Sequence, residues 1–258
     1  MLLAFRELSL QPNGKLHVNF LDVGQGDSVL LQTPSGNHIL IDGGPDLSTL
    51  EHLGNLMPFF KRRIEYVVLT HPDLDHLSAL PEVLNRYQIK KLFIAGTKKD
   101  EPRYLKLLKL AEKNNIPIHL LKMGMIMETS DGVKIEVIFP FDDDIDHKKT
   151  NNDSIVLRVV YNDNSILLTG DIEEIAEQKI LASGIDLSSS ILKVAHHGSK
   201  TSSSTGFLLA VNPELAIVSS GKENRFGHPH PNVINRFKRM GISLRHTAKN
   251  GTISLEFP

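Results

Sequence analysis

A short segment of this 258-residue chain gathers side chains of the kinds that bind metal ions. The segment contains His71, Asp73, Asp75 and His76. It directly follows Tyr66 to Thr70, a β-branched run typical of a strand buried on both faces. Because α/β proteins place their sites at the C-terminal ends of such strands, one loop there can direct all four side chains inward. Imidazoles and carboxylates at this density favour a cation between them. A helix cap at Asp73 or Asp75 is the alternative, but a cap needs only one acid.

Three further polar clusters follow predicted strands later in the chain. They are Thr169-Gly170-Asp171, Ala195 to Thr201 and Gly227 to Pro231. Asp171 is either a helix N-cap or a bridging metal ligand. The pair His196–His197 is unusual at a strand end, where two adjacent histidines are rarely both core residues. His230 before Pro231 also fits the start of a helix. Since all these clusters follow strands, we expect them to converge at one rim as one site.

The residues after His197 favour an anionic ligand. Gly198, Ser199, Lys200 and Thr201 offer backbone N–H groups, hydroxyls and a cation. The spacing of a Walker loop is absent. We therefore expect a cradle for phosphate oxygens that differs from that of the P-loop nucleotide-binding proteins.

The surrounding pattern predicts two similar halves, each a β-meander followed by alternating helices and strands. The expected strands are 15–23, 27–33, 38–42, 66–70, 92–95, 133–139, 154–161, 165–168, 191–195, 215–219, 242–246 and 252–257. The expected helices are 47–60, 77–86, 103–114, 172–182, 205–210 and 232–240. No Pro/Gly/Ser-rich linker interrupts this order, so we predict one domain in which two sheets pack between helices. The acidic run from Asp142 to Asp146 is expected to be a surface loop without a metal role.

Composition excludes several classes of protein. The chain has no cysteine, which excludes a disulfide scaffold, cysteine-ligated zinc or iron–sulfur sites and thiol catalysis. No apolar run approaches the roughly 20 residues of a membrane helix, and the first residues do not predict a signal peptide. The net charge of −1 hides an acidic middle and a basic C-terminal region. Glu128 to Asp186 carries 14 acids and 5 bases, whereas Ser190 to Asn250 carries 2 acids and 9 bases. Such a basic region is either a solvated face or a surface for phosphates.

Several motifs taken together resemble a known family. The order D-G-G at Asp42, T-H-x-D-x-D-H at Thr70, T-G-D at Thr169 and a late histidine is similar to the metallo-β-lactamase superfamily. Further segments resemble the soluble domain of the ComEC family of bacterial competence proteins, which contain a membrane channel for DNA uptake. These segments are 20–28, 152–157, 192–199 and 227–229. The resemblance runs from about Leu16 to Phe257 and implies that residues 1–258 form a single domain, an α/β four-layer αββα sandwich.

The resemblance implies a site for two divalent metal ions. His71 and Asp73 would bind one ion, Asp75 and His76 the second, and Asp171 would bridge both. His228 resembles the late histidine ligand of the second ion, while His196 and His197 occupy the place of a catalytic or phosphate-contacting histidine. Which of these three histidines binds metal is left open. Asp42 would orient the metal-binding loop as a supporting residue. Gln25 and Asp27 would contact substrate at the mouth of the site.

Two departures from the zinc-binding pattern favour harder ions. Asp73 stands where the pattern has its second histidine, and the next expected histidine falls near Asn151 to Asp153. Both changes replace nitrogen with oxygen, so Mn²⁺ is favoured, with Mg²⁺ or Zn²⁺ as alternatives.

The expected activity is metal-assisted hydrolysis of phosphodiester bonds in DNA. Asp75 would orient or deprotonate the attacking water, and His196 or His197 would protonate the leaving oxygen or contact the phosphate. The expected contacts to the substrate come from Asn151, Ser199, Lys200, Thr201 and His230. With 6% aromatic residues and no tryptophan, base stacking is expected to be a minor contribution. By resemblance, the enzyme would degrade the strand that is not imported during natural competence. It would then be a domain, on the extracytoplasmic side, of a protein with a membrane channel.

Two other functions fit parts of the sequence. A small-molecule ester or amide hydrolase would use the same metal pair, but it has no need of a basic surface. A non-catalytic module that binds DNA or gates a channel would need the basic surface, but it would not need His71, Asp73, Asp75, His76 and Asp171 together.

Overall fold

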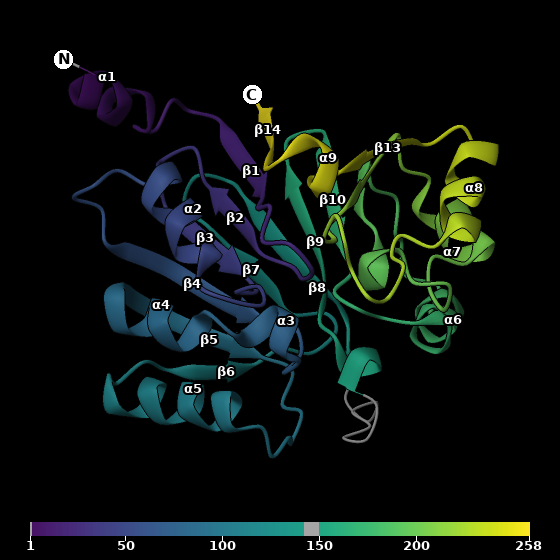
Figure 1. Ribbon diagram of the computed structural model, residues 1–258, viewed down its shortest axis with the longest axis horizontal. Coiled ribbons are helices and arrows are strands. Elements are labelled where there is room, and N and C mark those ends of the chain that lie inside the picture. The colour runs from purple at the N-terminus through teal and green to yellow at the C-terminus, as the bar shows by residue number, and fades with distance from the viewer. Residues whose placement is uncertain (1, 142–149) are drawn as a thin grey trace.

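The computed structural model shows two β-sheets that face each other between two layers of helices (Figure 1). It describes residues 2–141 and 150–258, but not the side chains of residues 2–5 and 150. The acidic run from Asp142 to Asp146 lies outside the described residues. In Figure 1, α2, α4 and α5 cover the left of the sheets and α6, α7 and α8 cover the right. The predicted four-layer αββα sandwich is confirmed.

The first sheet has the strand order β14-β1-β2-β3-β4-β5-β6. Neighbours from β14 to β3 pair antiparallel, and those from β3 to β6 pair parallel. Its strands are β1 (Leu16–Phe20), β2 (Val29–Gln32), β3 (His38–Ile41), β4 (Arg63–Leu69), β5 (Gln88–Ile94), β6 (Ile118–Leu120) and β14 (Ile253–Phe257). The last strand of the chain thus completes the first sheet.

The second sheet repeats this plan with the order β13-β12-β11-β10-β9-β8-β7. Its antiparallel part runs from β7 to β10 and its parallel part from β10 to β13. Its strands are β7 (Ile126–Glu128), β8 (Lys134–Phe139), β9 (Val156–Tyr161), β10 (Asn164–Leu168), β11 (Ile191–Lys193), β12 (Leu215–Val218) and β13 (Ser243–His246). The parallel strands of both sheets end near the middle of the molecule, and the polar clusters follow these ends.

The helices cover the outer faces of the sheets. Those beside the first sheet are α2 (Ser48–Leu56), α3 (Leu74–Leu77), α4 (Leu80–Arg86) and α5 (Pro102–Lys113). Those beside the second are α6 (Glu174–Ala182), α7 (Thr205–Val211) and α8 (Pro231–Arg239). The remaining helices are α1 (Leu2–Ser9), α9 (Thr247–Asn250) and the short 3₁₀ turns η1 (Thr150–Asp153) and η2 (Ala195–Gly198). The predicted helix 77–86 is in fact two helices, α3 and α4, and α3 carries two of the candidate ligands.

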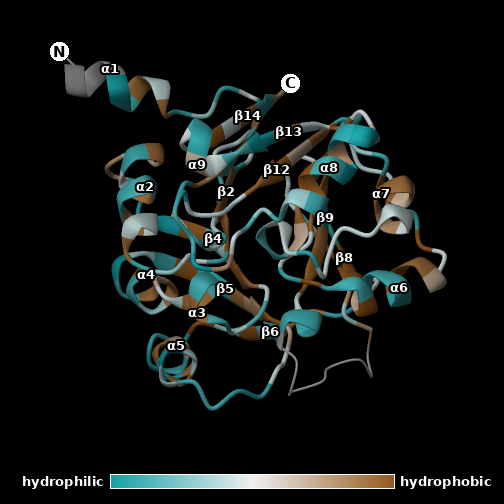
Figure 2. Ribbon diagram, turned by 45° about the vertical axis from the view of Figure 1, so that its right-hand side comes forward, coloured by the Kyte–Doolittle hydropathy of each residue, from teal (hydrophilic) through white to brown (hydrophobic). Residues whose placement is uncertain are grey.

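Three hydrophobic clusters hold the four layers together. Alternate residues of β4 show the division, because Val68 packs between the sheets while Val67 and Leu69 pack under the helices. In β10, Ile166 and Leu168 face the other sheet while Leu167 faces α6 and α7. Strands buried on both faces are apolar throughout, and Figure 2 shows this hydrophobic colour concentrated on the central strands.

Candidate active site

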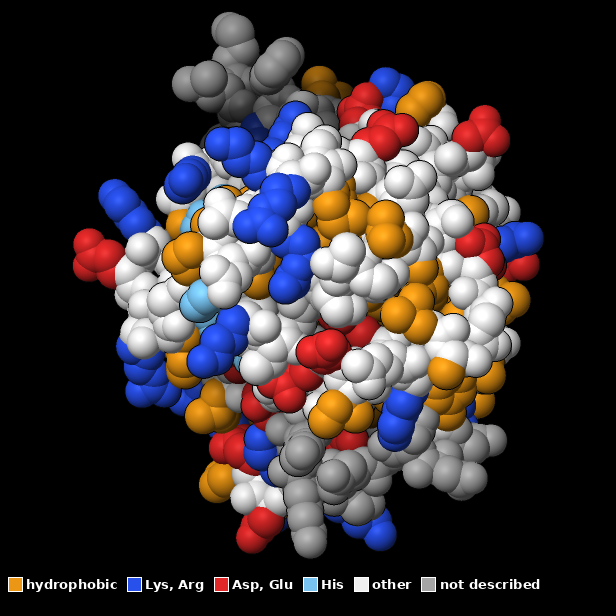
Figure 3. All heavy atoms as spheres, turned by 90° about the vertical axis from the view of Figure 1, so that its right-hand side faces the viewer, with side chains coloured by type: hydrophobic (Ala, Val, Ile, Leu, Met, Phe, Trp, Pro, Cys, Tyr) orange, Lys and Arg blue, Asp and Glu red, His pale blue; other side chains and the backbone are white. Residues whose placement is uncertain are grey.

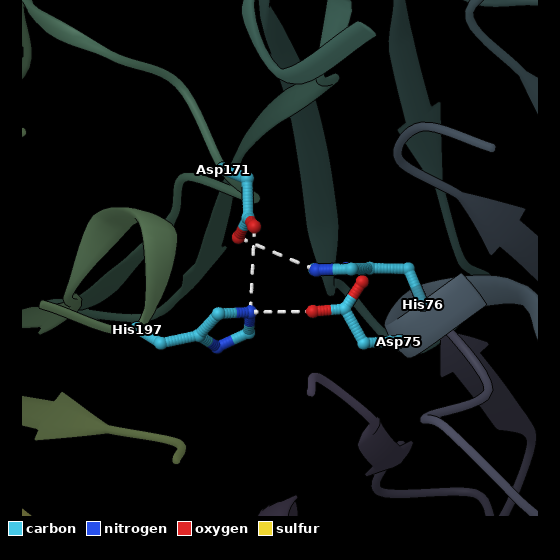
Figure 4. A group of neighbouring side chains, drawn as sticks. All are labelled: Asp75, His76, Asp171 and His197. Carbon is cyan, nitrogen blue, oxygen red and sulfur yellow. Dashed lines mark hydrogen bonds and ion pairs between the residues drawn. The ribbon is translucent and has the colours of Figure 1, made fainter. Parts of the chain in front are cut away.

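Four side chains from three loops meet where the parallel strands end. They are Asp75, His76, Asp171 and His197. Asp75 and His76 come from α3 after β4, Asp171 follows β10, and His197 lies in η2 after β11. Figure 4 shows their polar ends pointing toward one another, and one ligand atom from each lies within 4.8 Å of the others. The predicted convergence therefore brings residues from both sheets into one cluster.

Asp42 fixes the ring of His76. The His76 Nδ1 lies 2.7 Å from the Oδ2 atom of Asp42, and the same carboxylate accepts hydrogen bonds from the backbone and hydroxyl of Thr70. The other ring nitrogen, Nε2, lies 3.3 Å from the Oδ1 atom of Asp171. Because Nδ1 is held by Asp42, Nε2 is the nitrogen presented to the cluster. This is the supporting role expected of Asp42, which adopts a left-handed φ of 62° to reach it.

His197 is held in a similar way from the opposite side. Its Nδ1 donates a hydrogen bond to the carbonyl oxygen of Ser219 at 2.8 Å. Its Nε2 lies 3.2 Å from Asp75 and 3.3 Å from Asp171. A neutral ring that donates from Nδ1 would turn a lone pair toward these two carboxylates. The arrangement is therefore favourable only if the ring is protonated or a cation lies between these groups.

The charges in the cluster shift its pKa values in opposite directions. Burial lowers the pKa of His197, but Asp171 and Asp27 outweigh it and hold that pKa well above its usual value. Burial raises the pKa of Asp171, but His197 and His76 outweigh it and hold that pKa well below its usual value. The cluster thus keeps its acids ionised in a buried place, which is the property required of metal ligands.

A buried ion pair lies behind His197. Lys193 is 1% exposed, and its Nζ atom lies 2.7 Å from the Oδ2 atom of Asp27. The other oxygen of Asp27 lies 3.3 Å from the Nδ1 atom of His197. Asp27 therefore joins a buried cation to the ring that faces the metal-binding cluster, and the pair helps to hold that ring in place.

The backbone that presents the two histidines is strained. His196 and His197 have φ values of 50° and 54°, and Gly198 has a φ of 84°. Left-handed conformations cost about 1–3 kcal/mol for a residue that is not glycine, and they cluster at functional sites. Gly198 is required for a second reason, since a Cβ there would lie 2.6 Å from the Cβ atom of Pro229.

Several buried atoms in and beside the cluster fit a metal ion. Among the described residues, the Nε2 atoms of His71 and His76 and the Oδ1 atom of Asp171 have no hydrogen-bond partner. Buried polar atoms without partners are costly unless a cation satisfies them. The ring of His71 lies 4.2 Å from that of His76, measured between centroids. The donor set therefore matches the divalent ions expected from the sequence.

The second group of potential ligands around His76 is already engaged. Asp27, Asp42 and His76 also place ligand atoms within 4.8 Å of one another. However, Asp42 binds Thr70 and His76, and Asp27 pairs with Lys193. We therefore infer that Asp27 and Asp42 support the metal-binding residues.

Asp73 lies at the outer side of the site, and His71 is buried beside it. The Nε2 atom of His71 is 3.9 Å from the Oδ2 atom of Asp73. Asp73 also pairs with Lys99, and its side chain is 29% exposed. The structure thus places this pair beside the four-residue cluster, with Asp73 the more open of the two.

The three late histidines occupy different positions. His197 belongs to the cluster, whereas His196 lies 3.9 Å from Asp171 and 3.5 Å from Glu173. His228 lies further out, with its ring centroid 5.6 Å from that of His196. Burial, followed by the charges of His196 and His197, lowers the pKa of His228 to about 4. The structure therefore brings His197 into the ligand group, where the resemblance had implied His228.

Comparison with known proteins agrees with this geometry. A family model described as the metallo-beta-lactamase superfamily matches residues 21–222. The chain belongs to this superfamily. It is 33% identical over 257 residues to ComE operon protein 3 of Bacillus subtilis, covering 93% of this chain and 33% of that protein. It is also 33% identical over 245 residues to competence protein ComA of Neisseria gonorrhoeae, covering 94% of this chain and 32% of that protein. The chain thus spans about a third of the length of these relatives.

Solved structures of the superfamily share the fold. The metallo-beta-lactamase fold protein YhfI from Bacillus subtilis superposes with a TM-score of 0.64 at 12% identity, over 94% of this chain and 99% of that one.

Over the residues described, no helix is long and apolar enough to cross a membrane.

The residues expected to bind substrate lie in different environments. Asp27 is 4% exposed and faces Lys193, which corrects the expectation that it contacts substrate at the mouth. Gln25 accepts a hydrogen bond from the backbone of Gly221. The Nδ1 atom of His230 accepts a hydrogen bond from the backbone of Asn232 at the start of α8, which engages that nitrogen in a helix cap.

The remaining residues expected to bind substrate lie beside the late histidines or in the loop that follows them. Asn151 lies beside His196, with 3.4 Å between the amide nitrogen and Nε2. Ser199 is buried and its hydroxyl lies 3.0 Å from that of Thr201. Lys200 is exposed. The 198–201 loop therefore still offers a cation and hydroxyls beside the metallo-β-lactamase site.

Two residues of the site were not among those predicted. Lys193 is a single cation in the otherwise apolar run Ile191 to Val194, and that isolation was a usable signal. Glu173 accepts a hydrogen bond from the hydroxyl of Thr201 at 2.8 Å and lies next to His196. The one sequence feature that could have pointed to Glu173 is its position two residues after Asp171.

Proposed function

We propose that this chain is a metal-dependent phosphodiesterase that cuts DNA. The observation that carries the proposal is the buried cluster of Asp75, His76, Asp171 and His197, with its unpartnered ligand atoms, beside the 198–201 loop. Membership in a superfamily of metal-dependent hydrolases supports the hydrolytic part. The basic surface around the site supports the choice of a phosphate-rich substrate.

Asp75, His76, Asp171 and His197 would hold one divalent ion, and His71, Asp73 and Asp171 would hold a second. When bound, the ions supply positive charge that stabilises the attacking and leaving oxygens of the phosphodiester. The oxygen-rich donors of the outer position favour Mn²⁺ over Zn²⁺.

The protein's own groups orient and neutralise the reactants. Asp75 has the most exposed side chain of the four clustered residues, at 31%, so it is the acid best placed to orient water. His196 is 20% exposed and lies 3.5 Å from Glu173, so it is the histidine placed to face the leaving oxygen. Lys200 would neutralise charge on the phosphate oxygens.

The surface beside the site suits a phosphate backbone. Exposed cations are numerous on the C-terminal half. Figure 3 shows Lys and Arg side chains gathered over the upper left and left of one face, with acids across its lower middle and at its upper right. These exposed cations include Lys200, Lys222, Arg225, Lys238, Arg239 and Arg245. An open groove of about 550 Å³ between α7 and α8 is lined by Arg236 and Arg239. Binding should therefore weaken steeply with salt and read little sequence.

The relatives suggest where such an enzyme acts. The two competence proteins support a role in DNA uptake, in which the enzyme degrades the strand that is not imported. In that role the chain would be part of a longer protein with a membrane channel and would lie on the extracytoplasmic side.

DNA cutting by the purified protein tests the proposal. Protein loaded with Mn²⁺ should cut end-labelled DNA, and Asp75→Asn should abolish cutting. Asp163→Asn is a matched control, since this exposed aspartate lies in the turn between β9 and β10, at the end of the strands away from the site. If the metal-loaded protein binds DNA and leaves it intact, the chain is a binding or gating module. If it hydrolyses a lactone or β-lactam and not DNA, it is a small-molecule hydrolase.

A further inference from the structure

We propose that the ring of Phe226 is a stacking platform for an unpaired base, so that the preferred substrate is single-stranded DNA. This inference rests on the proposed function and names the form of its substrate. Phe226 lies in the loop between β12 and α8, and its side chain is 53% exposed. An apolar ring kept this open beside a catalytic cluster is available to a ligand.

A continuous series of rings connects Phe226 to the cluster. Its ring stacks on that of His228, with centroids 5.7 Å apart and planes inclined by 24°. The ring of His228 in turn lies 5.6 Å from His196 and 6.5 Å from His197. Phe226 is therefore two ring-to-ring steps, through His228, from His197 of the cluster. A base stacked on Phe226 would lie near the place where the phosphate is cut.

The loop that carries the ring is fixed before any ligand arrives. The side-chain amide of Asn224 donates hydrogen bonds to the carbonyls of Gly221 and His228, and its oxygen accepts one from the backbone of His228. Gln25 accepts a further bond from the backbone of Gly221. Because the loop is already ordered, a base that stacks there loses little affinity to ordering the protein.

A cation next to the ring completes a nucleotide subsite. The guanidinium carbon of Arg225 lies 4.9 Å from the centroid of the Phe226 ring. Because the guanidinium lies over a face of the ring, an incoming base would displace it from that face, and the guanidinium would then be free to pair with the adjacent phosphate. An aromatic face accepts any base, so the subsite should be tolerant of sequence.

The geometry distinguishes single strands from duplexes. In a duplex the faces of the bases are covered by their neighbours, so an open ring reaches them only where the strands separate. The low aromatic content led us to expect little stacking. One exposed ring at the site suffices to change that expectation. The other exposed phenylalanines among the described side chains, Phe59 and Phe60, lie in the loop before β4, at the opposite end of that strand from the site.

Cleavage of matched strands by variants of Phe226 tests the inference. The substrates are a single-stranded oligonucleotide, the same strand made fully abasic, and a blunt duplex, each with Mn²⁺. Phe226→Ala should raise KM for the normal strand about tenfold and leave KM for the abasic strand unchanged. Phe226→Leu should behave like Phe226→Ala because it keeps apolar bulk without an aromatic face, while Phe226→Tyr should retain wild-type kinetics. Phe60→Ala is the control for removal of an exposed ring.

The outcomes separate this inference from the proposed function. If the wild type cuts none of the three substrates, the proposed function fails. If the wild type cuts DNA but Phe226→Ala and Phe226→Leu keep the wild-type KM for the normal strand, the stacking platform is overturned. Equal cutting of the blunt duplex and the single strand by the wild type also overturns it.

Discussion

Buried histidines at the two ends of the sheets have opposite electrostatic surroundings. His38 begins β3 at the end away from the site, and His197 lies at the rim where the parallel strands end. Both are 1% exposed. Around His38, burial and then the charge of Lys61 lower its pKa to about 4. Around His197, the carboxylates of Asp171 and Asp27 outweigh burial and raise its pKa.

The difference shows that burial of an imidazole does not by itself indicate a site. Neither ring nitrogen of His38 has a hydrogen-bond partner within the described part of the chain, and the nearest charge that affects its pKa is a cation. His197 instead has each ring nitrogen directed by a neighbour, Nδ1 by Ser219 and Nε2 by Asp75 and Asp171. Carboxylates gathered around oriented rings are what distinguish the metal-binding end from the structural end.

The largest expected effect comes from removing the buried cation behind His197. Lys193→Met leaves Asp27 buried without its partner, so the free energy of unfolding should fall by about 3–5 kcal/mol. The double variant Lys193→Met with Asp27→Asn should recover most of this loss, because no buried charge remains unpaired. Urea unfolding of the metal-free proteins measures both. A loss below about 1 kcal/mol in the single variant would show that the pair is not a buried charge pair in solution.

A smaller effect is expected from the residue that orients His76. Asp42→Asn keeps the size of the side chain but weakens its hold on the Nδ1 atom of His76, so affinity for Mn²⁺ should fall about 10–100-fold. Calorimetric titration of metal-free protein measures the affinity. Asp22→Asn serves as the comparison, since Asp22 lies outside the cluster. An unchanged affinity for Asp42→Asn would remove Asp42 from the support of the site.

The low pKa of His38, at the end of the sheets away from the site, should make the stability of the protein depend on pH. The pKa of His38 is about 4 in the folded chain, against about 6.5 in the unfolded chain. The unfolded chain therefore binds the proton first, and stability is lost as pH falls from about 6.5 to about 4. Between pH 7 and pH 5 this should cost the wild type about 2 kcal/mol more than it costs His38→Leu. Urea unfolding at the two pH values measures the difference, and equal pH dependence would mean that His38 titrates normally.

Most of the fold was accessible from the sequence because local signals agreed with one another. The β-branched run at Tyr66 predicted β4, and the strand patterns at 154–161 and 165–168 predicted β9 and β10. The short strands β6 and β7 were not predicted. All three residues of β6 are exposed, so no alternation of buried and exposed residues marks it. β7 alternates, but its three residues are too few for the pattern to be recognised.

The sequence predicted where the site lies, but not which of its residues contact one another. The positions of His71, Asp75, His76 and Asp171 after strands were enough to predict one rim. The sequence could not choose between His197 and His228, because the choice depends on the left-handed turn of η2. The contact of Lys193 with Asp27 joins β11 of the second sheet to the loop before β2 of the first, and no local pattern encodes such a distant contact.

The binding of Mn²⁺ tests the central claim most directly. Wild-type protein stripped with a chelator and dialysed to equilibrium against Mn²⁺ should retain two ions per chain by elemental analysis. The Asp171→Asn variant should retain at most one, because both proposed positions would use Asp171. A wild type that retains no more Mn²⁺ than this variant would contradict the account of a two-metal centre at the rim of the sheets.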